Sequence, residues 1–250
     1  MAATLRLRYA GFTHIGMKRS QNQDHFVCAP ELSVFVVCDG MGGHKGGETA
    51  SLLAVTTICD SIRAAKNAGG TIAPNAVLRN AILDANRAVN ERAKVQPELQ
   101  GMGTTCTTLF FHGGTAYIGH VGDSRAYLLH PKRIWQLTRD HSLVQEKLRA
   151  GLITRDQLKT DKMKNVITRS VGFEGQVDVD IYQMAVHAGD SFLLCSDGLS
   201  GLCDDSELTE VMDSNRASKK TLEDTAKALC EAANRNGGDD NVTSVLVSIS

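Results

Sequence analysis

The sequence predicts an α+β sandwich. Strand-like and helix-like stretches are segregated along the chain, which favours packed layers over alternating βαβ units. Three apolar stretches each end at an aspartate, and a fourth begins just after one. With 250 residues, the chain forms one large domain or two small ones and can bury a full core.

The first part of the chain carries strand and helix signals in a clear order. Period-two alternation and apolar runs predict strands, and apolar residues at helical spacing predict helices with one buried face. A polar loop at residues 16–24 separates the first two strands. The predicted strands are residues 4–12, 25–28 and 34–38, and the predicted helices are residues 48–66 and 73–95.

The second part contains a run of strands separated by glycine-containing turns, followed by more strands and two helices. We expect Asp205 or Ser206 to cap the first of these helices. Asp178 and Asp180 alternate onto one face, which we interpret as exposed and solvated. The predicted strands are residues 102–111, 115–123, 125–130, 181–184, 191–196 and a last strand after Asp240, and the helices are 205–212 and 222–236.

Residues 137–172 form a long segment without a strand of its own. It contains two short helical patterns broken by Gly151 and lies between two strands that end at aspartates. Such a segment is typical of a lid or flap, although two ordinary packed helices explain the pattern equally well. His141 and Arg169 are its residues of most interest.

Four aspartates mark the ends of strands. Asp39, Asp123 and Asp197 follow apolar runs, whereas Asp240 precedes one, so antiparallel pairing would bring all four to one rim. Carboxylates gathered there would repel each other and be costly to desolvate, which implies a cation among them. Ligands that are all oxygen favour Mg²⁺ or Mn²⁺ over zinc or copper.

The glycines after Asp39, in the sequence DGMGGHKGG, leave backbone that can approach an ion or an anion. A tight turn between a strand and a helix explains this stretch alone equally well. A nucleotide-binding phosphate loop is excluded because the stretch lacks a Gly-Lys-Ser/Thr ending.

Composition excludes several classes of partner. The chain has 27 basic and 28 acidic residues and no basic run, so neither nucleic acid nor an anionic membrane is expected as a partner. Its start is too polar for a signal peptide, and no apolar run approaches the roughly 20 residues of a membrane span. Seven scattered cysteines without a C-x-x-C pair indicate free thiols in a reducing compartment. We expect a cytoplasmic monomer.

Six short motifs occur in a recognisable order. They are RSQNQD (19–24), DGMGGH (39–44), GTT (103–105), GDSR (122–125), SDGL (196–199) and DN (240–241). Over residues 10–248, their order and spacing resemble those of the metal-dependent PPM/PP2C-type serine/threonine protein phosphatases, in the compact bacterial branch.

This resemblance implies a single domain over residues 1–250, with two stacked antiparallel sheets flanked by helices and a flap at about residues 139–170. It also implies hydrolysis of phosphoserine and phosphothreonine in proteins, by in-line attack of a water that bridges two Mn²⁺ or Mg²⁺ ions. The partners would be phosphorylated proteins, and the enzyme would oppose a eukaryotic-like Ser/Thr kinase.

The resemblance also assigns metal ligands. Asp39 would bridge both ions, and the backbone carbonyl of Gly40 would serve one of them. Asp197 and Asp240 would complete the other. Asp123, together with Asp197, matches a third metal site found in bacterial relatives.

By the same resemblance, Asp24 would orient metal-bound water without binding the metal itself. Arg19, five residues earlier, would grip the phosphate, because its planar guanidinium can hold two oxygens at once. The alternative for an arginine in a loop is simple solvent exposure.

One position departs from the family. Animal members have a histidine, proposed as the general acid, where this chain has Met41. His44 is the nearest imidazole and could take that role, a metal-bound water could supply the proton instead, or His44 could be a loop residue without a catalytic part. A catalytically dead scaffold protein is a further alternative, but its expected signature, loss of a metal aspartate, is absent from this sequence.

Overall fold

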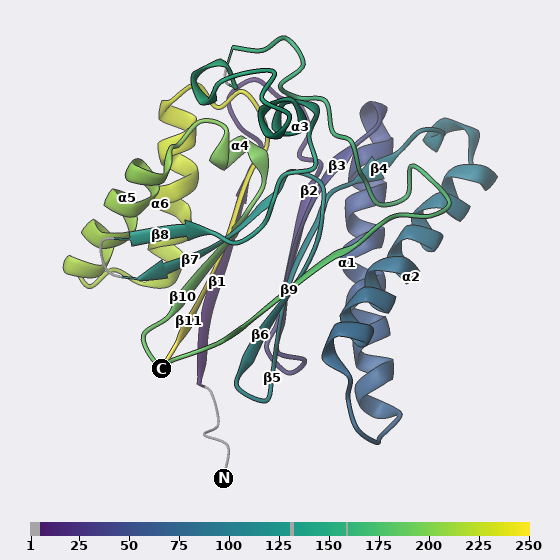
Figure 1. Cartoon of the computed structure of the whole chain (residues 1–250), viewed down its shortest axis with the longest axis horizontal. Coiled ribbons are helices and arrows are strands. Elements are labelled where there is room, and N and C mark those ends of the chain that lie inside the picture. Colours follow the sequence, from purple (N-terminus) through teal and green to yellow (C-terminus); the bar gives the residue numbers. More distant parts are fainter. Residues whose placement is uncertain (1–5, 131–132, 159) are drawn as a thin grey trace.

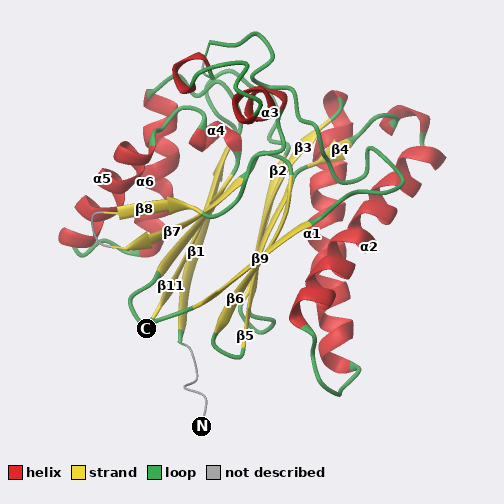
Figure 2. Ribbon diagram, viewed as in Figure 1, coloured by secondary structure: helices red, strands yellow, loops and turns green. Residues whose placement is uncertain are grey.

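Two antiparallel sheets lie face to face between two layers of helices (Figure 1, Figure 2). The computed structural model describes residues 6–130, 133–158 and 160–250. α1 (Gly43–Asn67) and α2 (Pro74–Val95) cover one sheet, and α5 (Asp205–Ala217) and α6 (Leu222–Arg235) cover the other. Short helices and loops close the end at the top of Figure 1. The predicted α+β sandwich with antiparallel sheets is thus confirmed.

Each sheet combines strands from distant parts of the chain. The first contains, in spatial order, β1 (Leu7–His14), β11 (Val242–Ile249), β10 (Ser191–Cys195), β7 (Arg125–His130) and β8 (Arg133–Gln136). The second contains β2 (Asp24–Ala29), β3 (Val34–Met41), β5 (Cys106–His112), β6 (Thr115–Val121) and β9 (Asp180–Ala185), with β4 (Gly103–Thr104) paired to β3.

The sheets are buried on both faces, which explains why several strands are apolar without alternation. In β3, Val34 and Val36 pack toward α1 and α2, whereas Phe35 and Val37 point between the sheets. Phe35 meets Phe111 edge to face, with ring centroids 6.2 Å apart. The sandwich therefore has one apolar layer between the sheets and one under each helical layer.

The long helices lie close to their predicted positions. α6 begins with a capping box in which Thr221 and Asp224 bond to each other's backbone N–H groups. In the described part of the chain no helix is long and apolar enough to cross a membrane. The helices are α1 (Gly43–Asn67), α2 (Pro74–Val95), η1 (Pro97–Leu99), α3 (Leu143–Arg149), η2 (Arg155–Gln157), α4 (Asp197–Ser200), α5 (Asp205–Ala217) and α6 (Leu222–Arg235).

Three boundaries differ from prediction. α1 begins at Gly43 rather than at residue 48, because the glycines that were expected to form a loop are helical. α5 is capped by Asp204, whose Oδ1 accepts a hydrogen bond from the Glu207 N–H at 3.0 Å, and not by Asp205 or Ser206. The first strand runs from Leu7 to His14, and residues 4 and 5 of its predicted range lie outside the described residues.

β8 was not predicted, and it extends the first sheet beyond β7. In the segment between β8 and β9, α3 and η2 match the two short helical patterns that flank Gly151. This segment is tied down by bridges from Ser142 to Ile167 and from Thr104 to Val171. We call residues 139–170 the flap segment below.

His120, in β6, is a histidine held neutral inside the protein. It is fully buried; its Nδ1 lies 3.0 Å from the Thr107 hydroxyl and its Nε2 lies 3.1 Å from the Arg139 carbonyl. Burial lowers the pKa of His120 to about 4. An unfolded chain would protonate this imidazole near its ordinary pKa of about 6.5.

This difference predicts a pH-dependent contribution to stability. Between pH 6.5 and pH 4 the unfolded state binds a proton that folded His120 does not, so the free energy of unfolding falls as the pH falls through this window. His120→Gln lacks this titrating imidazole. On acidification from pH 7 to pH 5, the free energy of unfolding of the variant should therefore fall by about 2 kcal/mol less than that of the wild type. Urea unfolding of both proteins at pH 7 and pH 5 measures this, and equal losses would contradict it.

Candidate active site

Five aspartates gather where strands of the two sheets end. Asp39 lies near the end of β3, Asp197 lies two residues after the end of β10, and Asp240 lies two residues before the start of β11, which runs antiparallel to β10. Asp24 begins β2, and Asp123 lies in the turn between β6 and β7. The rim predicted from the strand-end pattern therefore exists, and Asp24 belongs to it.

The carboxylates are close enough to influence one another strongly. Burial raises the pKa of Asp39 well above its ordinary value, and the charges of the four other aspartates raise it further. The pKa of Asp197 is raised by burial and then by Asp240. Such a concentration of negative charge calls for a compensating cation.

Two hydroxyl groups bind one oxygen of the Asp24 carboxylate. Its Oδ2 accepts hydrogen bonds from Ser196 Oγ and from Thr243 Oγ1, both at 2.7 Å. Burial, followed by the charges of Asp197 and Asp240, raises the pKa of Asp24 to about 7 despite these bonds. These bonds fix one carboxylate oxygen of Asp24, and the other has no hydrogen-bond partner. The Asp24 side chain can therefore orient a neighbouring group and act on it through its charge.

The backbone of Asp39 is fixed by the Gly-Thr-Thr motif. Its N–H donates to Thr105 Oγ1 at 2.9 Å, and its carbonyl accepts from the Thr105 N–H and the Thr104 hydroxyl, both at 2.8 Å. The next residue, Gly40, lies against the first turns of α1. A Cβ there would be 2.0 Å from the Gly47 carbonyl, so only glycine fits.

Asn241 organises the opposite side of the rim. Its Oδ1 accepts from the Gln23 N–H at 2.8 Å, and its Nδ2 donates to the carbonyls of Ile15 and Gln21 at 2.9 and 2.8 Å. This amide therefore holds the loop that leads into β2 beside Asp240. Asn241 was predicted only as part of the Asp-Asn motif and without a role of its own; its place next to Asp240 was the available signal.

Arg19 projects from the same loop toward the aspartates. Its Nη2 donates to Asp240 Oδ2 at 2.6 Å, while half of the side chain remains exposed. A cleft of about 480 Å³ opens beside it. Its lining residues are Arg19, Ser20, Gln21, Gln23, Asp39, Gly40, Met41, Gly42, Gly43, Asn165, Ile167, Asp197 and Asp240. Gln23 and the flap residues Asn165 and Ile167 were not predicted as site residues.

Asp123 lies at the edge of a second cleft that also contains Asp197. The residue is 8% exposed. Burial and the neighbouring Asp197 raise its pKa well above the ordinary value, with Arg125 acting in the opposite direction. Arg125 is itself held by a two-pronged contact to Asp140, with its Nη2 2.7 Å from Asp140 Oδ2.

The donor set fits a hard cation. The Oδ1 atoms of Asp24, Asp123 and Asp197 are buried and have no hydrogen-bond partner. A buried carboxylate oxygen without a donor is costly, and a metal ion or its bound water relieves that cost. Among the described residues, no three acidic, imidazole or thiol side chains are arranged so that they could hold a metal ion by themselves. Mg²⁺ and similar ions suit such an open site, because they retain water and use one or two carboxylates each.

The backbone of His44 lies in the first turn of α1, but its side chain is outside the described residues, so its catalytic role stays a prediction. Asp180 was interpreted as solvated, which is wrong. It is half-buried and accepts hydrogen bonds from His141, Arg169 and Tyr182, because the flap segment covers this face of β9.

Comparisons with known proteins agree with this geometry. A family model described as protein phosphatase 2C matches residues 10–246. The serine/threonine phosphatase stp of Listeria monocytogenes is 36% identical over 238 residues, covering 94% of this chain and 93% of that protein.

Solved structures give the same result. Stp1 of Staphylococcus aureus, a serine/threonine phosphatase, superposes with a TM-score of 0.85 at 32% identity, covering 100% of this chain and 97% of that one. The catalytic domain of PstP in complex with two manganese ions also superposes with a TM-score of 0.85 at 32% identity, covering 98% of this chain and 99% of that one. The chain therefore belongs to the protein phosphatase 2C family of serine/threonine phosphatases.

Proposed function

We propose that this protein hydrolyses phosphoserine and phosphothreonine in other proteins, using Mn²⁺ or Mg²⁺. One observation carries the proposal: a rim of five aspartates with three unpartnered buried oxygens borders an open cleft, with a half-exposed arginine at its edge. The PstP structure with two manganese ions supports the choice of metal.

The residues that would hold the two core ions are Asp39, the Gly40 carbonyl, Asp197 and Asp240. Asp123 and Asp197 would hold a third. When bound, the ions supply a water nucleophile at neutral pH and neutralise charge on the phosphoryl oxygens. Asp24 would orient water through its unbonded Oδ1, because its Oδ2 is already fixed by two hydroxyl groups.

Arg19 would bind the phosphate. The contact found for its guanidinium uses Nη2, and an arginine has five N–H donors, so others remain for phosphate oxygens. The cleft beside Arg19 is open to solvent, as a site for phosphoproteins must be. Phosphoserine and phosphothreonine in proteins are made by Ser/Thr kinases, and we infer that the enzyme opposes one.

Cysteine-based phosphate transfer is not supported by the thiols. A nucleophilic cysteine needs a lowered pKa. Here burial raises the pKa of Cys195, Cys203 and Cys230 to about 12, and that of Cys38, the thiol next to Asp39, is also well above the ordinary value.

The metal requirement is the first test. Phosphate release from a phosphothreonine peptide should require Mn²⁺ or Mg²⁺ and stop with EDTA. Asp39→Asn and Asp197→Asn should each lose release by orders of magnitude, because each removes a charge that the ions need. Asp213→Asn, on α5 outside the site, serves as the matched control. If the wild type binds Mn²⁺ in calorimetry but releases no phosphate, the protein is a phospho-binding scaffold instead.

Arg19 gives a second test. In Arg19→Ala the charge-assisted bonds to the phosphate are lost, so kcat/KM for the phosphopeptide should fall about 10- to 100-fold. Lys18→Ala is the control, because Lys18 is the adjacent cation and pairs with Asp239 on the surface. Equal losses in the two variants would mean that general positive charge, and not a specific phosphate contact, is responsible.

A further inference from the structure

His141 joins the flap segment to the turn that carries Asp123. Its backbone N–H donates to the Gly122 carbonyl at 2.8 Å, and the Gly122 N–H donates back to His141 Nδ1 at 3.1 Å. The side chain is 5% exposed. Gly122 directly precedes Asp123, so the imidazole bonds to the backbone next to a candidate metal carboxylate.

These contacts determine which nitrogen carries the proton. Because Nδ1 accepts from Gly122, the proton of the neutral ring is on Nε2, which donates to Asp180 Oδ2 at 3.2 Å. Arg169 Nη1 donates to the other oxygen of Asp180 at 3.0 Å. Arg169 Nη1 also lies 3.4 Å from His141 Nε2, and both of these nitrogens are donors that share the Asp180 carboxylate. Burial lowers the pKa of His141, in keeping with a neutral ring.

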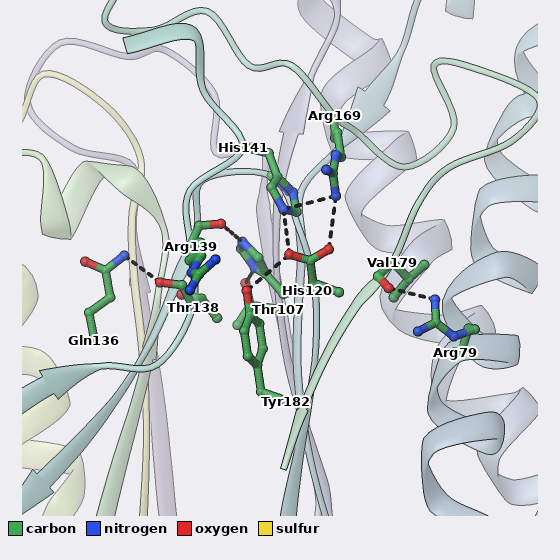
Figure 3. A network of polar contacts seen from close by, with 12 residues as sticks. Arg79, Thr107, His120, Gln136, Thr138, Arg139, His141, Arg169, Val179 and Tyr182 are labelled. Atoms are coloured by element: carbon green, nitrogen blue, oxygen red, sulfur yellow. Dashed lines mark hydrogen bonds and ion pairs between the residues drawn. The ribbon is translucent and has the colours of Figure 1, made fainter. Parts of the chain in front are cut away.

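Asp180 in turn is fixed from a third side. The Tyr182 hydroxyl donates to its Oδ2 at 3.1 Å. Burial acts to raise the pKa of Asp180, but the bonds from His141 and Tyr182 and the charge of Arg169 hold it below the ordinary value, so the acceptor stays ionised. Figure 3 shows His141, Arg169 and Tyr182 converging, with His120 next to His141.

The Asp123 turn needs such support. β6 ends at Val121 and β7 begins at Arg125, so Asp123 itself is outside both strands. Gly122 has a φ of +107°, and a Cβ there would lie 2.6 Å from Thr105 Cγ2. On the other side of Asp123, the Ser124 hydroxyl lies 2.7 Å from Thr105 Oγ1. The direction of the Asp123 carboxylate therefore depends on how its two neighbours are held.

We propose that His141 is a positioning residue that fixes the Gly122–Asp123 turn and so directs the Asp123 carboxylate toward its metal ion. Asp180, with Arg169, holds the imidazole in the required tautomer and orientation. The inference rests on the proposed metal site at Asp123.

The proposal also gives the flap segment a role. His141 and Arg169 come from its two ends, and the Thr168 N–H donates to the His141 carbonyl at 2.8 Å. The two ends are thus joined to each other and, through His141, to the Asp123 turn. A displacement of the flap ends would reorient Asp123.

Two amide substitutions separate this role from simple packing. Asparagine places an acceptor near the position of Nδ1 but does not reach Asp180. Glutamine reaches the position of Nε2 and can donate to Asp180, but it leaves the Gly122 N–H without an acceptor. Both are neutral and polar, so each serves as the control for the other.

The experiment is calorimetric titration of the full chain with Mn²⁺ alone, after removal of metal with EDTA. Asp123→Asn first identifies the binding event that belongs to Asp123. His141→Gln should weaken that event at least about 10-fold, as is typical when a residue that orients a metal ligand is lost. His141→Asn should leave it close to wild type.

A double substitution tests the route of the effect. If His141 acts through Asp123, His141→Gln should change nothing further in the Asp123→Asn background. If either amide variant fails to fold by circular dichroism, Asp180→Asn takes its place. This change weakens the hold on the ring and should weaken the same binding event.

The outcomes are distinct. If Asp123→Asn alters no binding event, the proposed metal site at Asp123 fails. If Asp123→Asn does alter a binding event, the metal site stands, and the His141 variants then test the positioning role. That role is overturned if His141→Gln and His141→Asn weaken the event equally, if neither variant weakens it, or if His141→Asn weakens it more than His141→Gln. An unchanged event in Asp180→Asn, where that variant is needed, would likewise overturn it.

Discussion

Repulsion among buried carboxylates is the main constraint on how the fold holds the five aspartates of the rim. Asp24, Asp39, Asp123, Asp197 and Asp240 lie within electrostatic range of one another, and the burial of most of their surface raises the pKa of several. Such a cluster is unstable without cations, so the fold must supply enough stabilisation elsewhere to hold it together. The fully buried apolar layers on both faces of each sheet provide that stabilisation.

Small residues let the rim close around the site. Gly40 lies against the Gly47 carbonyl, and Gly198 lies against the Asn241 carbonyl, where a Cβ would be 1.9 Å away. These contacts bring the backbone of α1 and the start of β11 directly onto the acidic residues. Glycine is thus required next to two of the aspartates, because a side chain there would force the elements that carry the site apart.

Much of this could be predicted from the sequence, because a strand that ends at an aspartate is a local pattern and antiparallel pairing brings such ends together. The start of α1 could not, since its glycines favour a loop unless packing against Gly40 is known. Asp180 was misinterpreted for a similar reason. Alternation indicates which face a strand residue occupies, but not that Arg169 and His141 from a distant segment will cover that face.

The aspartates differ in how they are held. Asp39 is within β3 and Asp197 begins α4. Asp240 lies two residues before the start of β11 and accepts a hydrogen bond from the Asn241 N–H, so strands and helices determine the positions of all three. Asp123 lies in a turn whose backbone depends on His141, a residue of the flap segment. The positions of the candidate core ligands are therefore set by the sandwich, whereas the turn of Asp123 is bonded to a surface segment that also borders the cleft. Asn165 and Ile167, which line the cleft, belong to this same segment, so the cleft wall and the support of the Asp123 turn come from one stretch of chain.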